Sequence, residues 1–437
     1  MKAAALIAGA IALLLLCSSC EAKVILVSLD GFRWDYIDIA KKNGTNVSAF
    51  EEIAQMGFRA EVQNVFITIT FPTHYAIATG RYVENHGLYN NQFRDPIFKQ
   101  SFSYKNATQQ MDPKWLEYNN NEPIWLTNQR HGNRSCVFYW PGSNQPYKGK
   151  YPFATSGLYS DDPTFKYRVD RLMDWITNDE FTFCAFYFNE PDHSGHAHGP
   201  NSQEVMNAIA EVNDGIAYLL QRIKSHPALN GKVNLIVTAD HGMTQIPVEN
   251  RVHLYKAVNS SSYYGNISPP VVGIWPKKGK SPEILESETD AIYKKLMDAK
   301  LPNLTVYQKE SIPEKYHYGR SYRMPPILAL ADPGYLIMIK DDYFTKNPPL
   351  GMHGYDNEFR EMHPFMVAYG PGIKKKEGLQ KFQQVDIYPF ICGLLGLQRP
   401  NIIDGQIERV LPFMNNPPSE EFVKTFKLYA SGIRADP

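Results

Sequence analysis

The chain has 437 residues, of which 43% are hydrophobic and 13% aromatic, enough to bury the core of one large domain or two modest ones. Its 45 basic and 45 acidic side chains give a formal net charge of zero. This balance, together with the absence of a long run of one sign, gives no indication of the basic patch or stripe with which proteins wrap a nucleic-acid polymer. A single nucleotide or another small anion stays possible as a ligand, because bound metal ions supply positive charge locally.

The first twenty residues have the pattern of a secretory signal peptide. Lys2 is followed by an apolar run over residues 3–16 and by the short segment Cys17–Cys20, and this order of basic start, apolar stretch and small residues is typical of such signals. The run is too short for a comfortable membrane span. A bacterial lipoprotein signal with a lipidated Cys20 is the alternative, which Cys17 disfavours because such signals prefer leucine at its position.

The rest of the chain predicts a secreted, extracellular protein. No later stretch reaches the length of a membrane span, so we expect no transmembrane segment. Asn-x-Ser/Thr acceptor sequences support the eukaryotic secretory route, although each tripeptide alone is a weak signal. The seven acceptor asparagines are Asn43, Asn46, Asn106, Asn133, Asn259, Asn266 and Asn303.

Three cysteines remain once residues 1–20 are removed, namely Cys136, Cys184 and Cys392. They are too few for a fold stapled by disulfides, and their odd number leaves at least one thiol unpaired or intermolecular. Cys184 lies in an apolar run and is expected in the core. The sequence does not decide how the three pair, and it does not support zinc bound by cysteines.

Short apolar runs alternate along the chain with amphipathic stretches. The first run, Lys23–Leu29, is continuous and β-branched and ends at Asp30, as a buried strand of a parallel sheet does. Residues 204–223 carry apolar side chains at helical spacing. We therefore predict an α/β fold, with a mostly parallel central sheet and helices on both faces. The other predicted strands cover residues 135–140, 181–188, 233–238 and 365–368.

The alternation becomes irregular between about residues 246 and 349, which are richer in Pro, Tyr and acceptor sequences. We interpret this stretch as an elaboration inserted before the last strands. The final thirty residues predict a helix and a tail packed on the outside. The predicted organisation is a signal peptide over residues 1–20 and a single catalytic domain over residues 21–437.

Potential metal ligands follow the ends of the predicted strands or lie in a late loop. Each alone has an ordinary interpretation as a helix cap or a packed side chain, but ligands bind beyond the carboxyl ends of strands in open α/β sheets. Three carboxylates and three imidazoles together form mixed oxygen and nitrogen sites that suit zinc. Two such ions would clamp a phosphoryl group between its attacking and leaving oxygens. The six candidates are Asp30, Asp192, His196, Asp240, His241 and His353.

Residues 68–75, with the sequence TITFPTHY, offer candidate nucleophiles. An isolated threonine hydroxyl is too weakly acidic to attack phosphorus at neutral pH, and coordination to a cation removes that obstacle. The local sequence does not choose among Thr68, Thr70 and Thr73.

Eight short motifs follow one another along nearly the whole mature chain. The ordered series resembles the ectonucleotide pyrophosphatase/phosphodiesterase family of the alkaline-phosphatase superfamily, and its short, single-domain members in particular. The resemblance implies an alkaline-phosphatase-like fold. The larger members' cysteine-rich modules and nuclease-like domain have no room here. The motifs are SLDGFR at 28–33, TFPxHY at 70–75, TG at 79–80, ENHG at 84–87, WPGS at 140–143, EPDxxGH at 190–196, DHGM at 240–243 and HGYDN at 353–357.

The resemblance implies two zinc ions and divides the six ligands between them. It selects Thr70 as the nucleophile and as a ligand of the second ion. The implied reaction passes through a phosphothreonine intermediate, whose hydrolysis releases a monoester such as a nucleoside monophosphate. The implied first site consists of Asp192, His196 and His353, and the second of Asp30, Asp240 and His241.

The resemblance also implies contacts with the substrate. Asn91 matches a family asparagine that donates a hydrogen bond to a phosphate oxygen, and with the backbone amide of Thr70 it would form an oxyanion-type site. Phe71 and Tyr187 match an aromatic pair that sandwiches a nucleobase. Core packing is the alternative interpretation of both aromatic residues.

Two positions depart from the family pattern. Many nucleotide-cleaving members carry lysine directly before the nucleophile and asparagine three residues after it, where this chain has Ile69 and Thr73. The missing lysine weakens the attraction for polyanionic substrates, although metal ions are the larger local charges, and so argues against nucleoside triphosphates as favoured substrates. We interpret His193 and His198 as solvated loop residues.

The sequence thus predicts a secreted, monomeric, zinc-dependent nucleotide phosphodiesterase or pyrophosphatase. Its small-molecule substrates would be dinucleotides, dinucleoside polyphosphates, NAD or nucleotide esters. A lysophospholipid or choline-phosphodiester hydrolase is the first alternative, because relatives use the same metal core on such lipids. The second is a catalytically silent surface-binding protein on the same fold, which the complete set of ligands disfavours.

Overall fold

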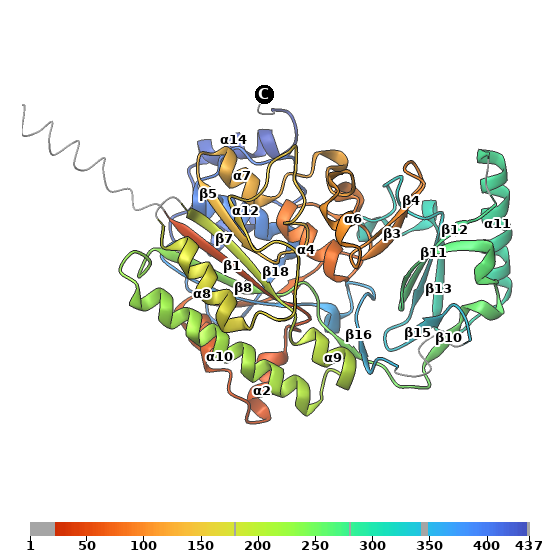
Figure 1. Ribbon diagram of the computed structural model, residues 1–437, viewed down its shortest axis with the longest axis horizontal. Helices are drawn as coiled ribbons and strands as arrows, with labels where there is room; N and C mark the ends of the chain where they lie inside the picture. The colour runs from red at the N-terminus through yellow and green to blue at the C-terminus, as the bar shows by residue number, and fades with distance from the viewer. Residues whose placement is uncertain (1–21, 179–180, 279–280, 342–347, 435–437) are drawn as a thin grey trace, which may run out of the picture.

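The computed structural model describes residues 22–178, 181–278, 281–341 and 348–434, so the predicted signal peptide lies outside the described residues. An eight-stranded sheet forms the centre of the molecule, with the strand order β18-β2-β17-β8-β1-β7-β5-β6 (Figure 1). In chain order its strands are β1 (Lys23–Leu29), β2 (Phe58–Gln63), β5 (Arg134–Phe138), β6 (Ala154–Thr155), β7 (Phe181–Phe188), β8 (Val233–Thr238), β17 (Phe365–Tyr369) and β18 (Leu379–Gln383).

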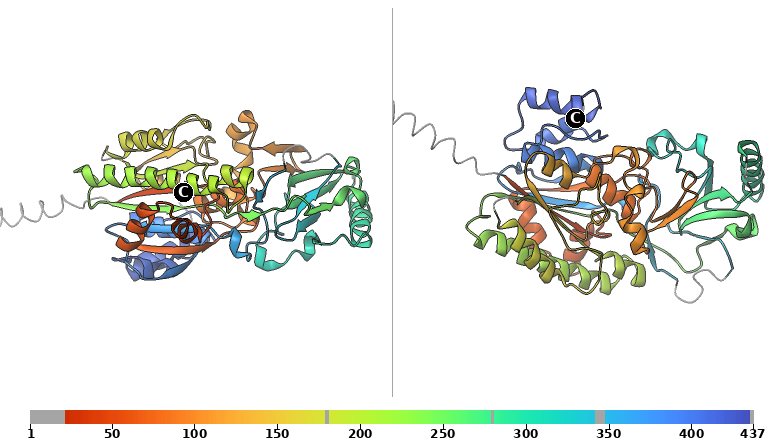
Figure 2. Two further views of the ribbon diagram at one scale, coloured as in Figure 1. Left: turned by 90° about the horizontal axis from the view of Figure 1, so that it is seen from below. Right: turned by 45° about the horizontal axis from the view of Figure 1, so that its top comes forward.

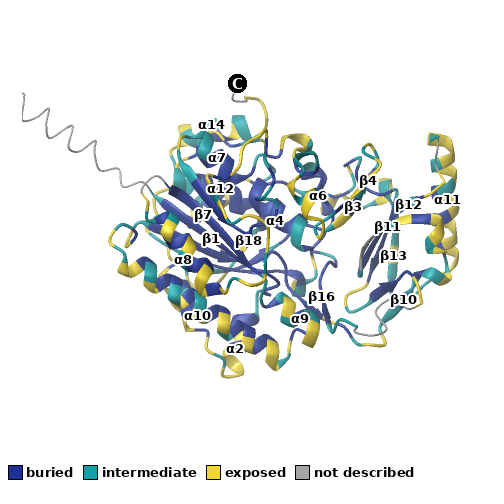
Figure 3. Ribbon diagram, in the orientation of Figure 1, coloured by how far each residue is buried: buried dark blue, intermediate teal, exposed yellow. Residues whose placement is uncertain are grey.

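The sheet is mostly parallel, which confirms the predicted fold class. Only β17 runs against its neighbours, pairing antiparallel with β2 and with β8. β1 lies between β7 and β8 and is parallel to both. These three central strands have the predicted bounds, and every residue in them is buried, because helices cover both faces (Figure 3).

The two faces of β1 contribute to two apolar cores. Ile25 and Val27 pack on one face with α2 (Tyr36–Lys42), α3 (Ser48–Met56), α8 (Phe165–Ile176) and α10 (Gln203–Ser225). Val24 and Leu26 pack on the other face with α4 (Thr70–Thr79), α7 (Ile124–Arg130), α12 (Ile387–Leu395), α13 (Ile407–Val410) and α14 (Glu420–Ala430). Successive strand side chains alternate between faces, so the sheet is the middle of three layers (Figure 2).

The predicted elaboration contains a smaller sheet beside the large one (Figure 1). Its four antiparallel strands have the order β11-β12-β14-β13, and α11 (Pro282–Asp298) packs on them. β11 also lies next to β3 (Gln92–Asp95), which forms a hairpin with β4 (Gln100–Ser103). The strands of this sheet are β11 (Tyr263–Ser268), β12 (Val271–Pro276), β13 (Leu304–Gln308) and β14 (Ile327–Ala331).

Cys136 and Cys184 stand opposite each other on β5 and β7, with their Cα atoms 4.5 Å apart, and are joined by a disulfide. Cys392 on α12 is free and buried, and burial raises the pKa of its thiol. Both cysteines of the pair are core residues, as expected for Cys184. Among the described helices, none is both long enough and apolar enough to cross a membrane.

A buried carboxylate on β2 fixes the segment that follows His353. The Glu61 side chain is 1% exposed, forms ion pairs with Arg360 and Lys381, and lies within 2.7 Å of Nδ1 of His363. Burial alone would raise the pKa of Glu61, but hydrogen bonds from Arg360, Lys381 and His363 outweigh it and lower the pKa to about 2. The folded protein therefore stabilises the ionised form of Glu61 more than the unfolded chain does.

We expect Glu61→Gln to lower the free energy of unfolding at pH 7 by about 2 kcal/mol, less than for a fully buried pair because two of the cations reach solvent. A group with a depressed folded pKa stabilises the protein above its unfolded pKa and loses that effect as the pH falls. The difference from wild type in urea unfolding should therefore narrow from pH 5 toward pH 2. Asp38→Asn, which removes an exposed partner of Arg59, is the control, and a difference that does not change with pH would contradict this assignment.

Candidate active site

Three adjacent strands deliver the predicted ligands to one edge of the large sheet. Asp30 directly follows β1, and Asp240 follows β8 after one intervening residue, with His241 next to it. β7 leads into α9 (Asp192–His198), where the i,i+4 spacing places Asp192 and His196 on one face of the helix. The parallel direction of these strands is what brings their carboxyl ends together.

His353 reaches the same edge from a distant part of the chain. It follows β16 (Gly351–Met352), which pairs antiparallel with β9 (Thr244–Gln245) just after β8. Its ring lies parallel to that of His241, with 3.5 Å between the ring centroids. The late loop therefore depends on the β9–β16 pairing for its place in the site.

The first implied ligand set is assembled in the structure. Asp192, His196 and His353 each offer one ligand atom, and these atoms lie within 4.8 Å of one another. The Nε2 atoms of the two histidines are 3.2 Å apart. Asp192 places Oδ2 3.4 Å from Nε2 of His196 and Oδ1 3.5 Å from Nε2 of His353.

The second implied set lies directly beside the first. Nε2 of His241 is 3.3 Å from Oδ1 of Asp30 and 3.0 Å from Oδ2 of Asp240. Ligand atoms of Asp30, Asp192 and His241 also lie within 4.8 Å of one another. Asp192 therefore lies between the two sets, whereas the resemblance places it in the first set alone.

All three histidines are oriented by backbone carbonyls. Their Nδ1–H groups donate to the carbonyl oxygens of Gly351, Gly242 and Thr68, each at 2.9 Å. These bonds fix the tautomer and turn each Nε2 lone pair toward the carboxylates, which is how proteins orient metal-binding histidines. Lone pairs facing carboxylate oxygens repel one another unless a cation lies between them.

The buried carboxylates of Asp30, Asp192 and Asp240 also need a cation to balance their charge. Oδ1 of Asp30, Oδ1 of Asp192 and Oδ2 of Asp240 are buried and have no hydrogen-bond partner among the described residues. Unpaired buried polar atoms are costly and rare in native proteins. The donor set of oxygen and nitrogen atoms suits zinc, so the residues present fit a pair of such ions.

The pKa shifts of three candidate ligands show how strongly their charges act on one another. Burial, and then the charges of Asp240 and Asp192, raise the pKa of Asp30 well above its usual value. The pKa of Asp240 is lowered despite burial, because His241 and His74 favour its ionised form. Burial, and then His241 and His196, lower the pKa of His353. One carboxylate is thus driven toward protonation while its neighbour stays charged.

The structure distinguishes the three candidate threonines. The Thr68 hydroxyl donates to the carbonyl of Tyr355 at 3.0 Å, and the Thr73 hydroxyl donates to that of Ile69 at 2.8 Å. Thr70 is the first residue of α4, and its Oγ1 lies 3.4 Å from Nε2 of His241. We call the six candidate metal ligands together the ligand cluster. Of the three threonines, Thr70 alone faces this cluster, at a helix N-terminus that favours anions.

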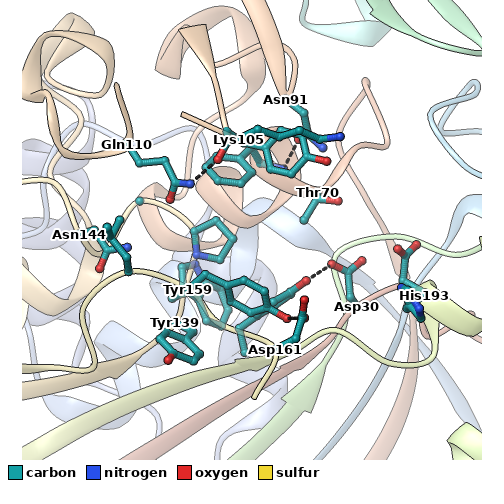
Figure 4. Close-up of a pocket in the computed structure, with 18 of the residues that line it drawn as sticks. Asp30, Thr70, Asn91, Lys105, Gln110, Tyr139, Asn144, Tyr159, Asp161 and His193 are labelled. Atoms are coloured by element: carbon teal, nitrogen blue, oxygen red, sulfur yellow. Dashed lines mark hydrogen bonds between the residues drawn. The ribbon is translucent and has the colours of Figure 1, made fainter. Parts of the chain in front are cut away.

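Thr70 and Asn91 both line a cavity beside the ligand cluster, and they lie on the same side of it (Figure 4). Oδ1 of Asn91 accepts a hydrogen bond from the N–H of Phe71 at 2.9 Å, which leaves Nδ2 as the donor for a ligand. The N–H of Thr70 has no partner among the described residues. These two donors match the oxyanion-type site that the resemblance implies.

The ligand cluster opens into a cavity of about 690 Å³, whose lining includes Phe71 and Tyr187. Phe71 is half-buried and packs near Tyr104, with 5.8 Å between ring centroids. The expected pairing of Tyr187 with Phe71 around a nucleobase stays a prediction. Tyr187 is 9% exposed, and its hydroxyl donates to Oδ2 of Asp30 at 2.5 Å, so strand β7 directs this side chain toward a ligand.

Tyr159 is the tyrosine that sequence reasoning missed. It is 36% exposed, lines the same cavity and packs edge-on against Tyr187 at 5.7 Å. Its position opposite Thr70 and Asn91 is visible in Figure 4. The available signal was an aromatic residue two positions before Asp161, in the loop that leads to α8.

The two extra histidines lie on helix α9 rather than in a loop. Both are exposed, and His193 lines the cavity, so the interpretation of His193 as a purely solvated residue was incomplete. Ile69, which precedes the candidate nucleophile, is 2% exposed and close to Gly354. It therefore adds no charge to the cavity.

A model of the type I phosphodiesterase/nucleotide pyrophosphatase family matches residues 24–356. The chain belongs to this family. Human ectonucleotide pyrophosphatase/phosphodiesterase family member 5 is 35% identical over 406 residues, which cover 90% of this chain and 80% of that protein. The human bis(5'-adenosyl)-triphosphatase is 37% identical over 390 residues, covering 88% and 80%. Human family member 7 is 32% identical over 402 residues, covering 90% and 84%.

Solved structures place this phosphodiesterase among the short members of the ectonucleotide pyrophosphatase/phosphodiesterase family. Murine family member 5, in an inactive threonine-to-alanine form in complex with AMP, matches with a TM-score of 0.82 and 36% identity over 90% of this chain and 100% of that one. Human family member 5 matches with a TM-score of 0.81 at the same identity and coverage. The chain is a hydrolase that acts on phosphodiester or phosphorus-containing anhydride bonds.

Proposed function

We propose that this phosphodiesterase hydrolyses small nucleotide diesters and pyrophosphates through a covalent phosphothreonine at Thr70, with two zinc ions bound. The observation that carries the proposal is the position of Thr70, whose Oγ1 lies 3.4 Å from Nε2 of His241 beside a cluster of unpaired nitrogen and oxygen lone pairs. The relative solved with AMP is described as inactive in a threonine-to-alanine form, which supports a threonine nucleophile.

The six ligands would hold the ions as two neighbouring sets. Asp192, His196 and His353 would form one set, and Asp30, Asp240 and His241 the other, with Thr70 next to the second. Bound there, zinc would stabilise negative charge on phosphoryl oxygens and lower the pKa of a coordinated hydroxyl or water. Tyr187 donates to Asp30 and so keeps the other oxygen of that carboxylate directed at the cluster.

The chain's own residues then account for two displacement steps. In the first, the Thr70 hydroxyl loses its proton to solvent and the Oγ1–phosphorus bond forms, while the bond from phosphorus to the leaving oxygen breaks and the leaving group departs with the bonding electron pair. In the second, water displaces Oγ1 from phosphorus, which frees the nucleoside monophosphate and restores the threonine hydroxyl. Nδ2 of Asn91 and the N–H of Thr70 donate to a non-bridging oxygen in both steps.

The retained nucleoside would lie between Phe71 and Tyr159. Both line the cavity, and stacking on aromatic rings accepts any nucleobase because every base has a π-face. Dinucleoside polyphosphates are suitable substrates, since one relative is named a bis(5'-adenosyl)-triphosphatase. With Ile69 in place of a lysine, the charge that binds a free triphosphate chain is reduced.

Choline phosphodiesters are the second candidate substrates. The observation that favours them is the cavity rim, where Asp161 accepts a hydrogen bond from the Tyr159 hydroxyl at 2.5 Å and Tyr139 packs on Tyr159 at 5.2 Å. Aromatic faces beside a carboxylate can bind a quaternary ammonium group. The same rim would serve a nucleobase equally well.

The test compares p-nitrophenyl thymidine monophosphate with p-nitrophenyl phosphorylcholine as substrates. We expect kcat/KM to be about ten- to a hundredfold higher for the nucleotide ester, the range that stacking of one base supplies. Both activities should disappear with a chelator and return with zinc. A preference for the choline ester would favour choline phosphodiesters as the substrates. The absence of turnover on both esters would favour a catalytically silent binding protein.

We also propose that the enzyme is a secreted, glycosylated monomer. Asn43, Asn46, Asn106 and Asn259 are exposed, whereas Asn133 and Asn303 are half-buried. The Asn266 side chain lies outside the described residues. Digestion with an N-glycosidase should lower the mass of protein recovered from the culture medium, and an unchanged mass would reject glycosylation.

A further inference from the structure

The β3–β4 hairpin forms one wall of the catalytic cavity. Asn91 lies directly before β3 and Tyr104 directly after β4, and both line the cavity. The N–H of Tyr104 donates to the carbonyl of Asn91 at 3.0 Å, which joins the two at the open end of the hairpin. Asn91 lies outside any helix or strand, so its position depends on what holds this hairpin.

The elaboration contacts the chain two residues before Asn91. The Tyr318 hydroxyl donates to the carbonyl of Tyr89 at 2.7 Å, and both residues are 2% exposed. The Tyr318 ring packs edge-on against Phe66, with 4.9 Å between centroids. Two residues span at most about 7 Å of extended chain, so a displacement at Tyr89 is transmitted directly to Asn91.

A second contact fixes the far end of the same segment. Arg323 is 1% exposed, and its Nε donates to Oδ2 of Asp95, the last residue of β3, at 2.7 Å. The rest of its guanidinium donates to the carbonyl of Trp115 at 2.8 Å and to that of Gly87 at 3.3 Å. A buried guanidinium paired in this way has one defined geometry. Residues 87–95 are therefore held at both ends by the elaboration.

We propose that Tyr318 is a positioning residue for catalysis, through which the elaboration sets the orientation of the Asn91 amide toward the phosphate oxygen. The inference rests on the proposed role of Asn91 as a donor in the transition state. The Asn91 side chain accepts one hydrogen bond, from the N–H of Phe71, and Tyr318 helps to fix the backbone from which this side chain extends. A donor displaced by a fraction of an ångström loses much of its effect, because preorganisation is what makes such donors effective.

The test variant is Tyr318→Phe, which keeps the buried ring and removes the bond to Tyr89. We expect kcat on p-nitrophenyl thymidine monophosphate to fall about tenfold, against about a hundredfold for removal of the donor itself in Asn91→Ala. KM and zinc content should stay at wild-type values, since ground-state binding and the metal ligands are not altered. Wild-type kcat in Tyr318→Phe would overturn the inference.

The matched control is Tyr263→Phe. Tyr263 lies on β11 of the same elaboration, and its buried hydroxyl has no hydrogen-bond partner among the described residues. This variant loses an equivalent hydroxyl and should retain wild-type kcat. An equal loss in both variants would show that any change in the elaboration slows the enzyme, and would overturn the specific role of Tyr318.

A double variant separates positioning from general loosening. If Tyr318 acts through Asn91, Tyr318→Phe should have no further effect on kcat in the Asn91→Ala background, because coupled residues are not additive. The same tenfold loss in that background would overturn the inference. If Tyr318→Phe melts far below wild type, Arg323→Lys replaces it in the same double-variant comparison with Asn91→Ala. This substitution keeps a positive charge opposite Asp95 and removes the hydrogen bonds to the backbone carbonyls of Gly87 and Trp115. Failure of the proposed function would appear separately, as full activity in Thr70→Ala.

Discussion

Replacing Thr70 with alanine is expected to lower kcat on p-nitrophenyl thymidine monophosphate by about 10⁴-fold or more, the scale observed when a covalent nucleophile is removed. The reason is geometric. Thr70 is the threonine in the TITFPTHY segment whose hydroxyl faces the ligand cluster, 3.4 Å from Nε2 of His241. Neither of the other two threonine hydroxyls in this segment can replace it, because those of Thr68 and Thr73 donate to backbone carbonyls.

Two further variants control this prediction. Thr70→Ser keeps a hydroxyl at the N-terminus of α4 and should retain measurable turnover. Thr73→Ala removes a hydroxyl from the next turn of the same helix, where it donates to Ile69, and should leave kcat within a few-fold of wild type. Acid quenching during turnover should trap a nucleoside phosphate on the peptide that contains Thr70. Full activity in Thr70→Ala would mean that water attacks phosphorus directly, and would reject the phosphothreonine.

The central strands could be predicted to the residue because their surroundings are uniform. β1, β7 and β8 are buried on both faces, so their sequences are near-continuous apolar runs with few polar interruptions, such as Asn234 in β8. β2 and β18 were missed because they carry charged residues. Glu61 on β2 is buried only because Arg360, His363 and Lys381, all about three hundred residues away, surround it. No local pattern contains those partners.

The candidate site shows the same limit at the level of single side chains. The ligands could be located because strand direction alone brings Asp30 and Asp240 to one edge of the sheet. The choice of Thr70 needed the fold or the family resemblance, since local sequence treats three threonines alike. The Tyr187 hydroxyl reaches Asp30, 157 positions away in the sequence, so the local sequence could show neither this contact nor that Tyr159 also lines the cavity.

The elaboration illustrates why position in the sequence is a poor guide to function. The sequence of residues 246–349 predicts an irregular insertion, and the four-stranded antiparallel sheet of this insertion lies beside the eight-stranded sheet (Figure 1). Yet Tyr318 and Arg323 contact the segment that carries Asn91 across separations of more than two hundred residues. We therefore expect substitutions in this part of the elaboration to change kcat without touching the metal ligands.

Removing the metal ions should abolish turnover and lower the melting temperature by about 5–10 °C, as expected when a ligand that binds only the folded state is withdrawn from a chain of this size. Without the ions, buried oxygens of Asp30, Asp192 and Asp240 have no partner among the described residues. Their mutual repulsion then opposes folding. Adding zinc to the stripped protein should restore both the activity and the melting temperature.

Metal analysis of single variants tests how the ligands are shared. His353→Ala should lower the zinc content from about two ions per chain to about one, because His353 belongs to a single set of three ligands. Asp192→Ala should lower it further, since Asp192 lies between the two sets and its carboxylate also comes within 4.8 Å of ligand atoms of Asp30 and His241. His198→Ala is the matched control, because this exposed histidine ends α9 outside both sets, and it should keep both ions. A chelated protein with unchanged activity and melting temperature would show that the cluster does not depend on a metal, and the two-ion proposal would have to be abandoned.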